Sequence, residues 1–216
     1  MNEKFQKTLI ITFIIVGLIF TLIGSTFAWL AVGAKTNNTT IRGGTYNFSV
    51  NLNVTALKSG GLIPVADNLV VQSLNSTHVC EDTRGYGLCS LYRLRFTNSG
   101  SAQTMTGYFK TNSSTYTTSN LKYRLFSLSG STYTAISDIA VVNHTVNATN
   151  NFTLSSNGVT VSLTDGSNSS TTKDVYLVIW VSDPGNNQLA DQNKSYNGTL
   201  TFTSTYGNSI TSSFSA

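Results

Sequence analysis

Asparagine supplies most of the candidate sites for covalent modification in this chain. Twelve asparagines begin an N-x-S/T triplet, the acceptor motif for N-linked glycans. They are Asn37, Asn38, Asn47, Asn53, Asn75, Asn112, Asn143, Asn147, Asn151, Asn168, Asn193 and Asn197. A glycan needs a solvent-facing side chain, so the motifs matter only where the fold exposes them. The simpler interpretation is that Asn and Thr occupy polar strand faces without being modified.

Cysteine offers a second covalent feature. Cys80 and Cys89 are the only cysteines, and an exported chain favours a disulfide between them. The bridge would close a loop of about ten residues and contribute about 2.5–3 kcal/mol in the chain-entropy model. The enclosed segment 81–88 is polar and contains glycines, which predicts an exposed hairpin tip. A redox role is disfavoured because the spacing is not C-x-x-C.

Residues for catalysis or metal binding are sparse. His78 and His144 are the only histidines, and we expect His144 to pack in the core. The sequence contains no H-E-x-x-H pair, no G-x-S-x-G turn and no phosphate-binding glycine motif. Asp165, Asp183 and Asp191 lie in Gly/Asn/Ser segments typical of turns, with a weak calcium site as the alternative. We therefore predict no catalytic residues, no metal site and no enzyme activity.

Charge is scarce along the whole chain. Of the 216 residues only 10% are charged, and the net charge is +4. From Trp29 onward there are 55 serines and threonines and 21 asparagines, so hydroxyls and amides must hydrate the surface. The sparse, scattered Lys and Arg argue against nucleic-acid binding. Arg93, Arg95 and Arg124 share a Tyr-rich region, and a ligand-binding face there is a weaker alternative.

The N-terminus has the pattern of an export signal. Lys4 and Lys7 precede the apolar run 8–23, and small residues follow up to Ala28. A basic start, an apolar stretch and a small-residue end predict a signal peptide over 1–28 with cleavage after Ala28. The alternative is a retained transmembrane helix, as in type IV pilins, since the stretch is long enough to span. Thr8 directly follows Lys7, whereas those pilins usually carry Gly or Ala there.

The rest of the chain reads as strands. In 45–56 apolar and polar residues alternate without a break, the pattern of a half-buried strand. We predict further strands at 69–74, 91–97, 104–110, 121–128, 131–136, 139–146, 151–156, 159–163, 175–181, 198–206 and 209–215. Their spacing predicts an all-β, antiparallel β-sandwich of the jelly-roll or Ig-like kind, with a head domain over 43–216. Segment 175–181 is apolar on both faces and should be central. No helical period is evident after residue 35.

The alternation places several acceptor asparagines opposite apolar residues. In 45–56 the apolar side chains have even numbers, whereas Asn47 and Asn53 are odd. The same reasoning sets Asn143 opposite Ala140, Val142 and Val146, with Asn147 continuing the outward parity. It sets Asn151 opposite Phe152 and Leu154, and Asn197 opposite Leu200 and Phe202. We therefore predict that these asparagines face solvent and that N-linked glycans occupy many of them.

Several segments resemble one family of secreted fibre proteins. They are GSTFAW at 24–29, KTNNTTI at 35–41, GGTY at 43–46, FTNSGS at 96–101 and NKSYNGTLTF at 193–202. Together they are similar to TasA and camelysin-type proteins. The dense acceptor motifs bring the chain nearest to archaeal thread and bundling-pilus subunits.

The resemblance implies donor-strand complementation, in which an extended N-terminal tail of one subunit completes the sandwich of the next. The tail would be 29–42, with Trp29, Leu30, Val32 and Ile41 as anchors. Because glycans at Asn37 and Asn38 would not fit inside a groove, we expect insertion over 29–36. Lys35 is a candidate for an isopeptide bond, since a desolvated lysine can act as a nucleophile.

The expected function is therefore that of an extracellular, glycosylated filament subunit, used for adhesion or biofilm formation. Its partners would be copies of itself, with no nucleic acid and only transient membrane contact during export. The alternatives are a membrane-anchored surface glycoprotein or type IV-like pilin, and a protease like those described among camelysins. For the protease, the sequence shows no recognisable set of zinc ligands.

Overall fold

The computed structural model describes residues 46–185, 189–191 and 193–216. The chain divides into two compact units, Met1–Phe48 and Ser49–Ala216, and all strands described here begin in the second. Within the described residues the elements are β1 (Val50–Lys58), α2 (Asp67–Leu74), β2 (Ser90–Asn98), β3 (Gln103–Ser114), β4 (Leu121–Ser129), β5 (Thr132–Ala135), β6 (Ala140–Val141), β7 (Thr149–Asn151), β8 (Thr153–Leu154), β9 (Asn157–Gly158), β10 (Thr160–Leu163), β11 (Thr171–Val181), the 3-10 helix η1 (Leu189–Asp191), β12 (Tyr196–Ser204) and β13 (Ser209–Ser215).

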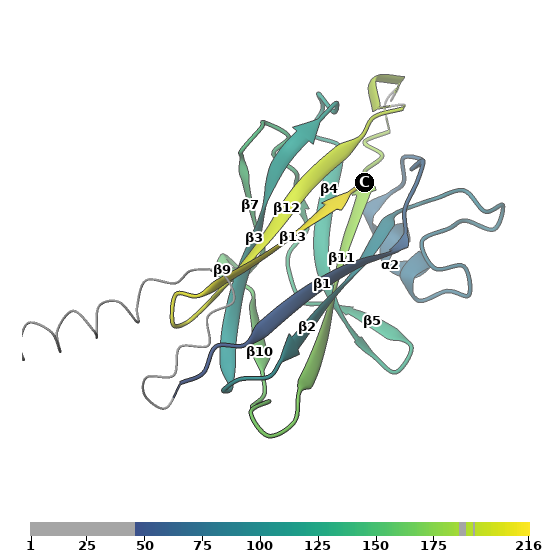
Figure 1. Cartoon of the computed structure of the whole chain (residues 1–216). Helices are drawn as coiled ribbons and strands as arrows, with labels where there is room; N and C mark the ends of the chain where they lie inside the picture. Colours follow the sequence, from purple (N-terminus) through teal and green to yellow (C-terminus); the bar gives the residue numbers. More distant parts are fainter. Residues whose placement is uncertain (1–45, 186–188, 192) are drawn as a thin grey trace, which may run out of the picture. The chain divides into compact units, whose positions relative to one another are not determined.

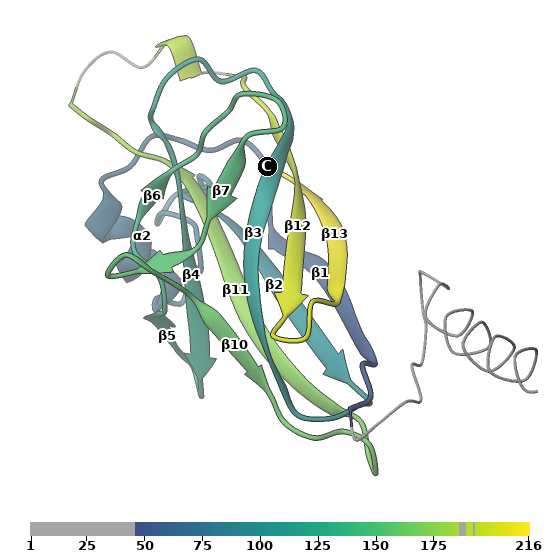
Figure 2. The ribbon, with the colours of Figure 1, turned by 90° about the vertical axis from the view of Figure 1, so that its left-hand side faces the viewer.

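Two antiparallel sheets form the second unit. The larger has the order β1-β2-β11-β4-β5, with β6 also pairing with β4; the smaller has the order β10-β3-β12-β13, with β7 also pairing with β3. Strands β8 and β9 form a separate short hairpin. Figures 1 and 2 show the two sheets packed face to face. The predicted all-β antiparallel sandwich is confirmed.

Strand β11 lies at the middle of the larger sheet. It pairs with β2 on one side and β4 on the other, and every residue from Val175 to Val181 is buried. One face packs against the smaller sheet, and part of the other lies beneath α2 and the loop after it. The apolar residues on both faces of 175–181 are thus explained, and the predicted central position is confirmed.

Aromatic rings fill the space between the sheets. The ring of Phe109 on β3 lies 4.8 Å from Tyr123 on β4, 5.5 Å from Phe214 and 5.6 Å from Phe152. The buried phenol of Tyr123 donates to the backbone oxygen of Asn151 at 2.7 Å. Burial of Tyr123 raises the pKa of its hydroxyl to about 12, because the phenolate would lose its hydration. The cluster therefore packs rings without leaving their hydroxyls unpaired.

The segment predicted as a strand at 69–74 is instead part of α2, so that prediction is wrong. Val70 and Leu74 are fully buried against the larger sheet, and their four-residue spacing is helical. Asp67 at the first turn accepts hydrogen bonds from Trp180 Nε1 at 2.9 Å and Lys122 Nζ at 2.6 Å. Burial raises the pKa of Asp67, but these bonds outweigh burial and leave the pKa below its usual value. The sheet thus holds the helix by its first residue.

Two further predicted strands are shorter than expected. Within 139–146 only Ala140–Val141 is a strand, and 151–156 is divided between β7 and β8. The segment between β6 and β7 turns because the Asn150 side chain accepts the backbone N–H of Asn143 at 2.6 Å. Asn147 within this turn has a positive φ of 67°. An asparagine tolerates that backbone region better than most residues. Because the chain is no longer extended at this turn, the alternation of faces ends.

Candidate functional site

The structure exposes most of the acceptor asparagines. Those with exposed residues are Asn53, Asn75, Asn112, Asn143, Asn147, Asn151, Asn168 and Asn193. Asn197 is half-buried, Asn47 precedes the sandwich unit, and Asn37 and Asn38 lie outside the described residues. The surface condition for glycan attachment is therefore met at eight positions.

The predicted parity is right in part. Leu52 is buried beside exposed Asn53, and Phe152 is 2% exposed beside exposed Asn151. The prediction that Val146 and Leu154 lie on the inward face, opposite the asparagines, is wrong, because both residues are exposed. The reason is local: neither residue lies in a continuous strand of the length that the alternation assumed.

The acceptor asparagines differ in how many hydrogen bonds their side-chain amides make. A glycan replaces one hydrogen of Nδ2, so an amide with both N–H groups engaged must lose a bond to accept it. Asn75 Nδ2 donates to the backbone oxygens of Val71 and Tyr133, both at 3.3 Å, and its Oδ1 accepts the Tyr133 N–H at 2.7 Å. Asn53 uses only Oδ1, which accepts from the Thr55 hydroxyl at 3.0 Å.

We expect Asn75 to remain unmodified, because its amide makes two hydrogen bonds to Tyr133 of β5 and a third to Val71 of α2. The measurement is mass spectrometry of the tryptic peptide 59–84, in which Asn75 is the only acceptor. The control is Asn53, whose Nδ2 is free; its peptide 43–58 also contains the acceptor Asn47, so fragmentation must assign the glycan to one of the two. A glycan on Asn75 in most molecules would contradict this ranking by amide engagement.

The outer face of the smaller sheet is almost entirely hydroxyl and amide. On β12 the outward residues are Thr199, Thr201 and Thr203, and the inward ones are buried. Neighbouring hydroxyls pair across strands: Thr199 with Ser213 at 3.3 Å and Thr203 with Ser209 at 2.8 Å. Hydroxyls supply most of the polarity of this face, and exposed Lys110 on β3, opposite Thr199, adds a charge.

A cavity opens on this face where β3 loses its edge partner. Strand β10 pairs with β3 as far as Thr106, and β7 begins pairing at Tyr108, so Gly107 lies between the two partners. The cavity has a volume of about 320 Å³, and its lining includes Tyr108, Asn151 and Thr203. Neither composition nor alternation signals it, because it depends on how β7 and β10 share one edge.

The opposite side of the sandwich ends in two long edge strands. Strands β1 and β13 lie side by side there, and Tyr92 of β2 donates its hydroxyl to the backbone oxygen of Ser215. Within the described residues β1 pairs only with β2, and β13 only with β12. Apart from the Ser215 oxygen, the outer backbone groups of β1 and β13 have no strand partner within the described residues, which is the condition for adding another strand.

The edge of β13 lacks the features that usually prevent strand addition. Its seven residues, SITSSFS, include no charge and no proline, and its register with β12 runs without a bulge. Strand β1 ends with Lys58 and a register shift after Ala56. The edge strands on the far side of the sandwich, β5, β6, β7 and β10, have four residues or fewer. Strand β13 is thus the least protected long edge among the described strands.

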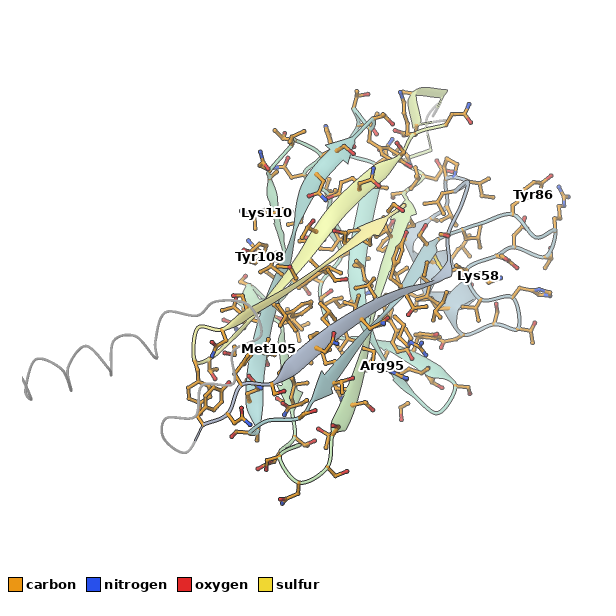
Figure 3. All side chains as sticks on the ribbon, viewed as in Figure 1. Lys58, Tyr86, Arg95, Met105, Tyr108 and Lys110 are labelled. Carbon is orange, nitrogen blue, oxygen red and sulfur yellow. A yellow bond between two sulfur atoms is a disulfide. The ribbon has the colours of Figure 1, made fainter. Side chains whose placement is uncertain are left out.

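The predicted disulfide between Cys80 and Cys89 is confirmed. The two sulfurs are bonded, and both residues are buried in a cluster with Leu91, Phe126 and Trp180 on the outer face of the larger sheet. The loop that it closes reaches away from the sheet, and Tyr86 is 55% exposed near its end (Figure 3). The predicted exposed tip is therefore correct, whereas the cystine itself belongs to the core.

The remaining chemical candidates are not brought together. His78 is exposed, and His144 is half-buried in the loop after β6 instead of in a core strand. Asp165 and Asp183 accept backbone N–H groups two residues ahead, as predicted for turns, while Asp191 binds Thr118. Across the described part of the chain no three His, Cys, Asp or Glu residues are grouped as metal ligands.

The three arginines do lie on one face. Arg93 and Arg95 project from β2 and Arg124 from β4, all on the outer side of the larger sheet beside Tyr176. Arg95 is bound to Asp174 by two hydrogen bonds of 2.8 and 2.7 Å, which lower the pKa of that carboxyl. Arg124 donates to the backbone oxygen of Ser137 at 2.7 Å. Two of the three guanidinium groups therefore have structural partners.

The predicted donor residues Trp29, Leu30, Val32 and Ile41 lie outside the described residues, as does Lys35. No described helix is long and apolar enough to span a bilayer. No protein-family model and no curated protein matches this chain.

Proposed function

We propose that the chain is a structural subunit of an extracellular, glycosylated filament, polymerised by donor-strand complementation. The observation that carries the proposal is the free edge of β13, seven residues long without charge, proline or bulge. Long edges of this kind pair readily with another strand unless something covers them. The occupant is the segment 29–36 of a second copy.

The chemistry of segment 29–36 suits this role. It reads WLAVGAKT, with no charge before Lys35. An added strand supplies backbone hydrogen bonds to the edge, and its alternate side chains fill the adjoining apolar positions. On β13 the inward positions Ile210 and Ser212 are only half-buried, next to buried Phe214. Apolar donor side chains would extend the core over these two positions.

The geometry of such a contact leads to a fibre. The donor segment precedes the head, and the acceptor strand is the last strand of the head, so the two surfaces differ. A contact between different surfaces is heterologous, and one that does not close into a ring continues as a filament. The exposed acceptor asparagines support an extracellular location, and the proposed use is adhesion or biofilm formation. The proposal includes no catalytic role and no cofactor other than N-linked glycans.

Deleting residues 29–36 should abolish filaments and leave a folded monomer, because the deletion removes the donor while the described sandwich keeps its own strands. Electron microscopy and analytical ultracentrifugation of the secreted protein measure assembly, and far-UV circular dichroism measures folding. A synthetic peptide of residues 29–36 should then bind the deleted protein. The matched control is the same peptide with aspartate at Leu30 and Val32, which should not bind. Filaments that persist after the deletion would refute the donor assignment.

A further inference from the structure

Among the acceptor asparagines of the described residues, Asn151 is the one that lines the cavity at Gly107. It lies on β7 directly opposite Tyr108 of β3. Side chains directly opposite in an antiparallel pair have Cβ atoms about 4.5–5.5 Å apart. Asn151 is exposed, and its side-chain amide makes no hydrogen bond to any described residue. A substituent on its Nδ2 therefore starts beside the Tyr108 ring with no bond to break.

The walls of the cavity combine an aromatic face with hydroxyls. Tyr108 is half-exposed, and Thr106, Thr153 and Thr203 contribute hydroxyl-bearing side chains. A pyranose ring has the matching character, since one face carries C–H groups and the rim carries hydroxyls. Tyrosine offers both an apolar body and a polar tip to such a ligand. The lining therefore suits a sugar better than a purely apolar group.

The size of the cavity also fits a single ring. Its volume of about 320 Å³ is at the lower end of the range of roughly 300–1,000 Å³ found for small-molecule sites. Gly158 lines it without a side chain, and nothing lies within 4 Å of where its Cβ would be, which leaves the space open. Thr153, the hydroxyl residue of the Asn151 motif, lines it as well. Acceptor motif and cavity are thus parts of one surface.

We infer that the first sugar of an N-linked glycan on Asn151 folds back into this cavity and stacks on Tyr108. The inference rests on the glycosylation included in the proposed function. The bound sugar fills the break between β7 and β10 and covers the neighbouring edge of Phe152. The glycan at this position is consequently part of the folded structure, in contrast to a glycan that extends into solvent. Figure 3 labels Tyr108 beside Lys110, whose exposed ammonium lies two residues along the same strand.

The test is a double-mutant cycle with Asn151→Gln and Tyr108→Thr. The full chain is secreted from its native host, and in parallel from a bacterial periplasm that attaches no N-glycans. Glycopeptide mass spectrometry measures occupancy at Asn151, and urea denaturation measures stability. Threonine keeps the β-propensity of a half-exposed outer position, so the variant should fold. Asn168→Gln, in an exposed turn that does not line the cavity, is the matched control.

In the glycosylated protein we expect the two substitutions to be coupled by roughly threefold in the folding equilibrium constant, a low value for contacting groups. In the unglycosylated protein the coupling should vanish, and Asn168→Gln should show none with Tyr108→Thr in either preparation. An unoccupied Asn151, or a coupling equal in the two preparations, overturns the inference. The filament assignment is judged separately by the deletion of 29–36, so the two failures are distinguishable.

Discussion

Gly107→Ala is expected to lower the free energy of unfolding by about 3 kcal/mol, the upper part of the usual cost of overpacking a core. A Cβ at this position would lie 2.2 Å from Cε1 and 2.4 Å from Cδ1 of Phe202. Phe202 is 1% exposed, with the ring of Phe96 at 4.8 Å and that of Phe152 at 6.2 Å. The ring therefore has no free space into which it could move.

A decrease in stability would distinguish a steric clash with Phe202 from an effect of strand propensity. Alanine favours a strand more than glycine does, so without the clash the substitution would stabilise the protein. Gly61→Ala is the matched control, since nothing lies within 4 Å of its added Cβ. Urea denaturation followed by circular dichroism gives both values. Equal urea midpoints for the two variants would contradict the clash, because the Phe202 ring would then be able to move aside.

Replacing both Cys80 and Cys89 with alanine is expected to cost about 3–4 kcal/mol of stability, within the usual range for a native disulfide. The closed loop is short, but both cysteines are buried at 0% and 2% exposure among core residues. Their loss therefore removes the cross-link and also leaves a small void. The damage should be local, because the cluster lies on the outer face of the larger sheet.

Hydrogen exchange locates this damage. Amides of α2 and of the loop 81–88 should lose protection in the double variant, while those of β3 and β12 should exchange as in the parent protein. Tyr86→Ala at the exposed end of the loop should change stability by less than about 0.5 kcal/mol. Protection that falls evenly through both sheets would contradict a local role for the cystine.

Local pattern was sufficient for most strands. Alternation in 198–206 identified β12 with its correct inward face, since period two is a property of the extended backbone itself. In 45–56 the strand β1 begins only at Val50, and of the predicted inward residues Leu52 is buried whereas Ala56 is exposed. The pattern failed at 69–74, where six apolar-rich residues fit both periods and burial of Val70 and Leu74 against the cystine cluster selected the helix. It failed again at 139–156, where side-chain hydrogen bonds to the backbone end the strands.

The candidate sites divide in the same way. The sequence alone determined the acceptor motifs, the cysteine pairing and the two-sided burial of 175–181, because each depends on residue type or on short spacing. Only the tertiary structure decided that the Asn75 amide is fully engaged and that Asn151 faces Tyr108 across a cavity. It also decided that β13 ends its sheet. These features depend on which strands become neighbours and in which register, and long-range pairing leaves no local periodicity to read.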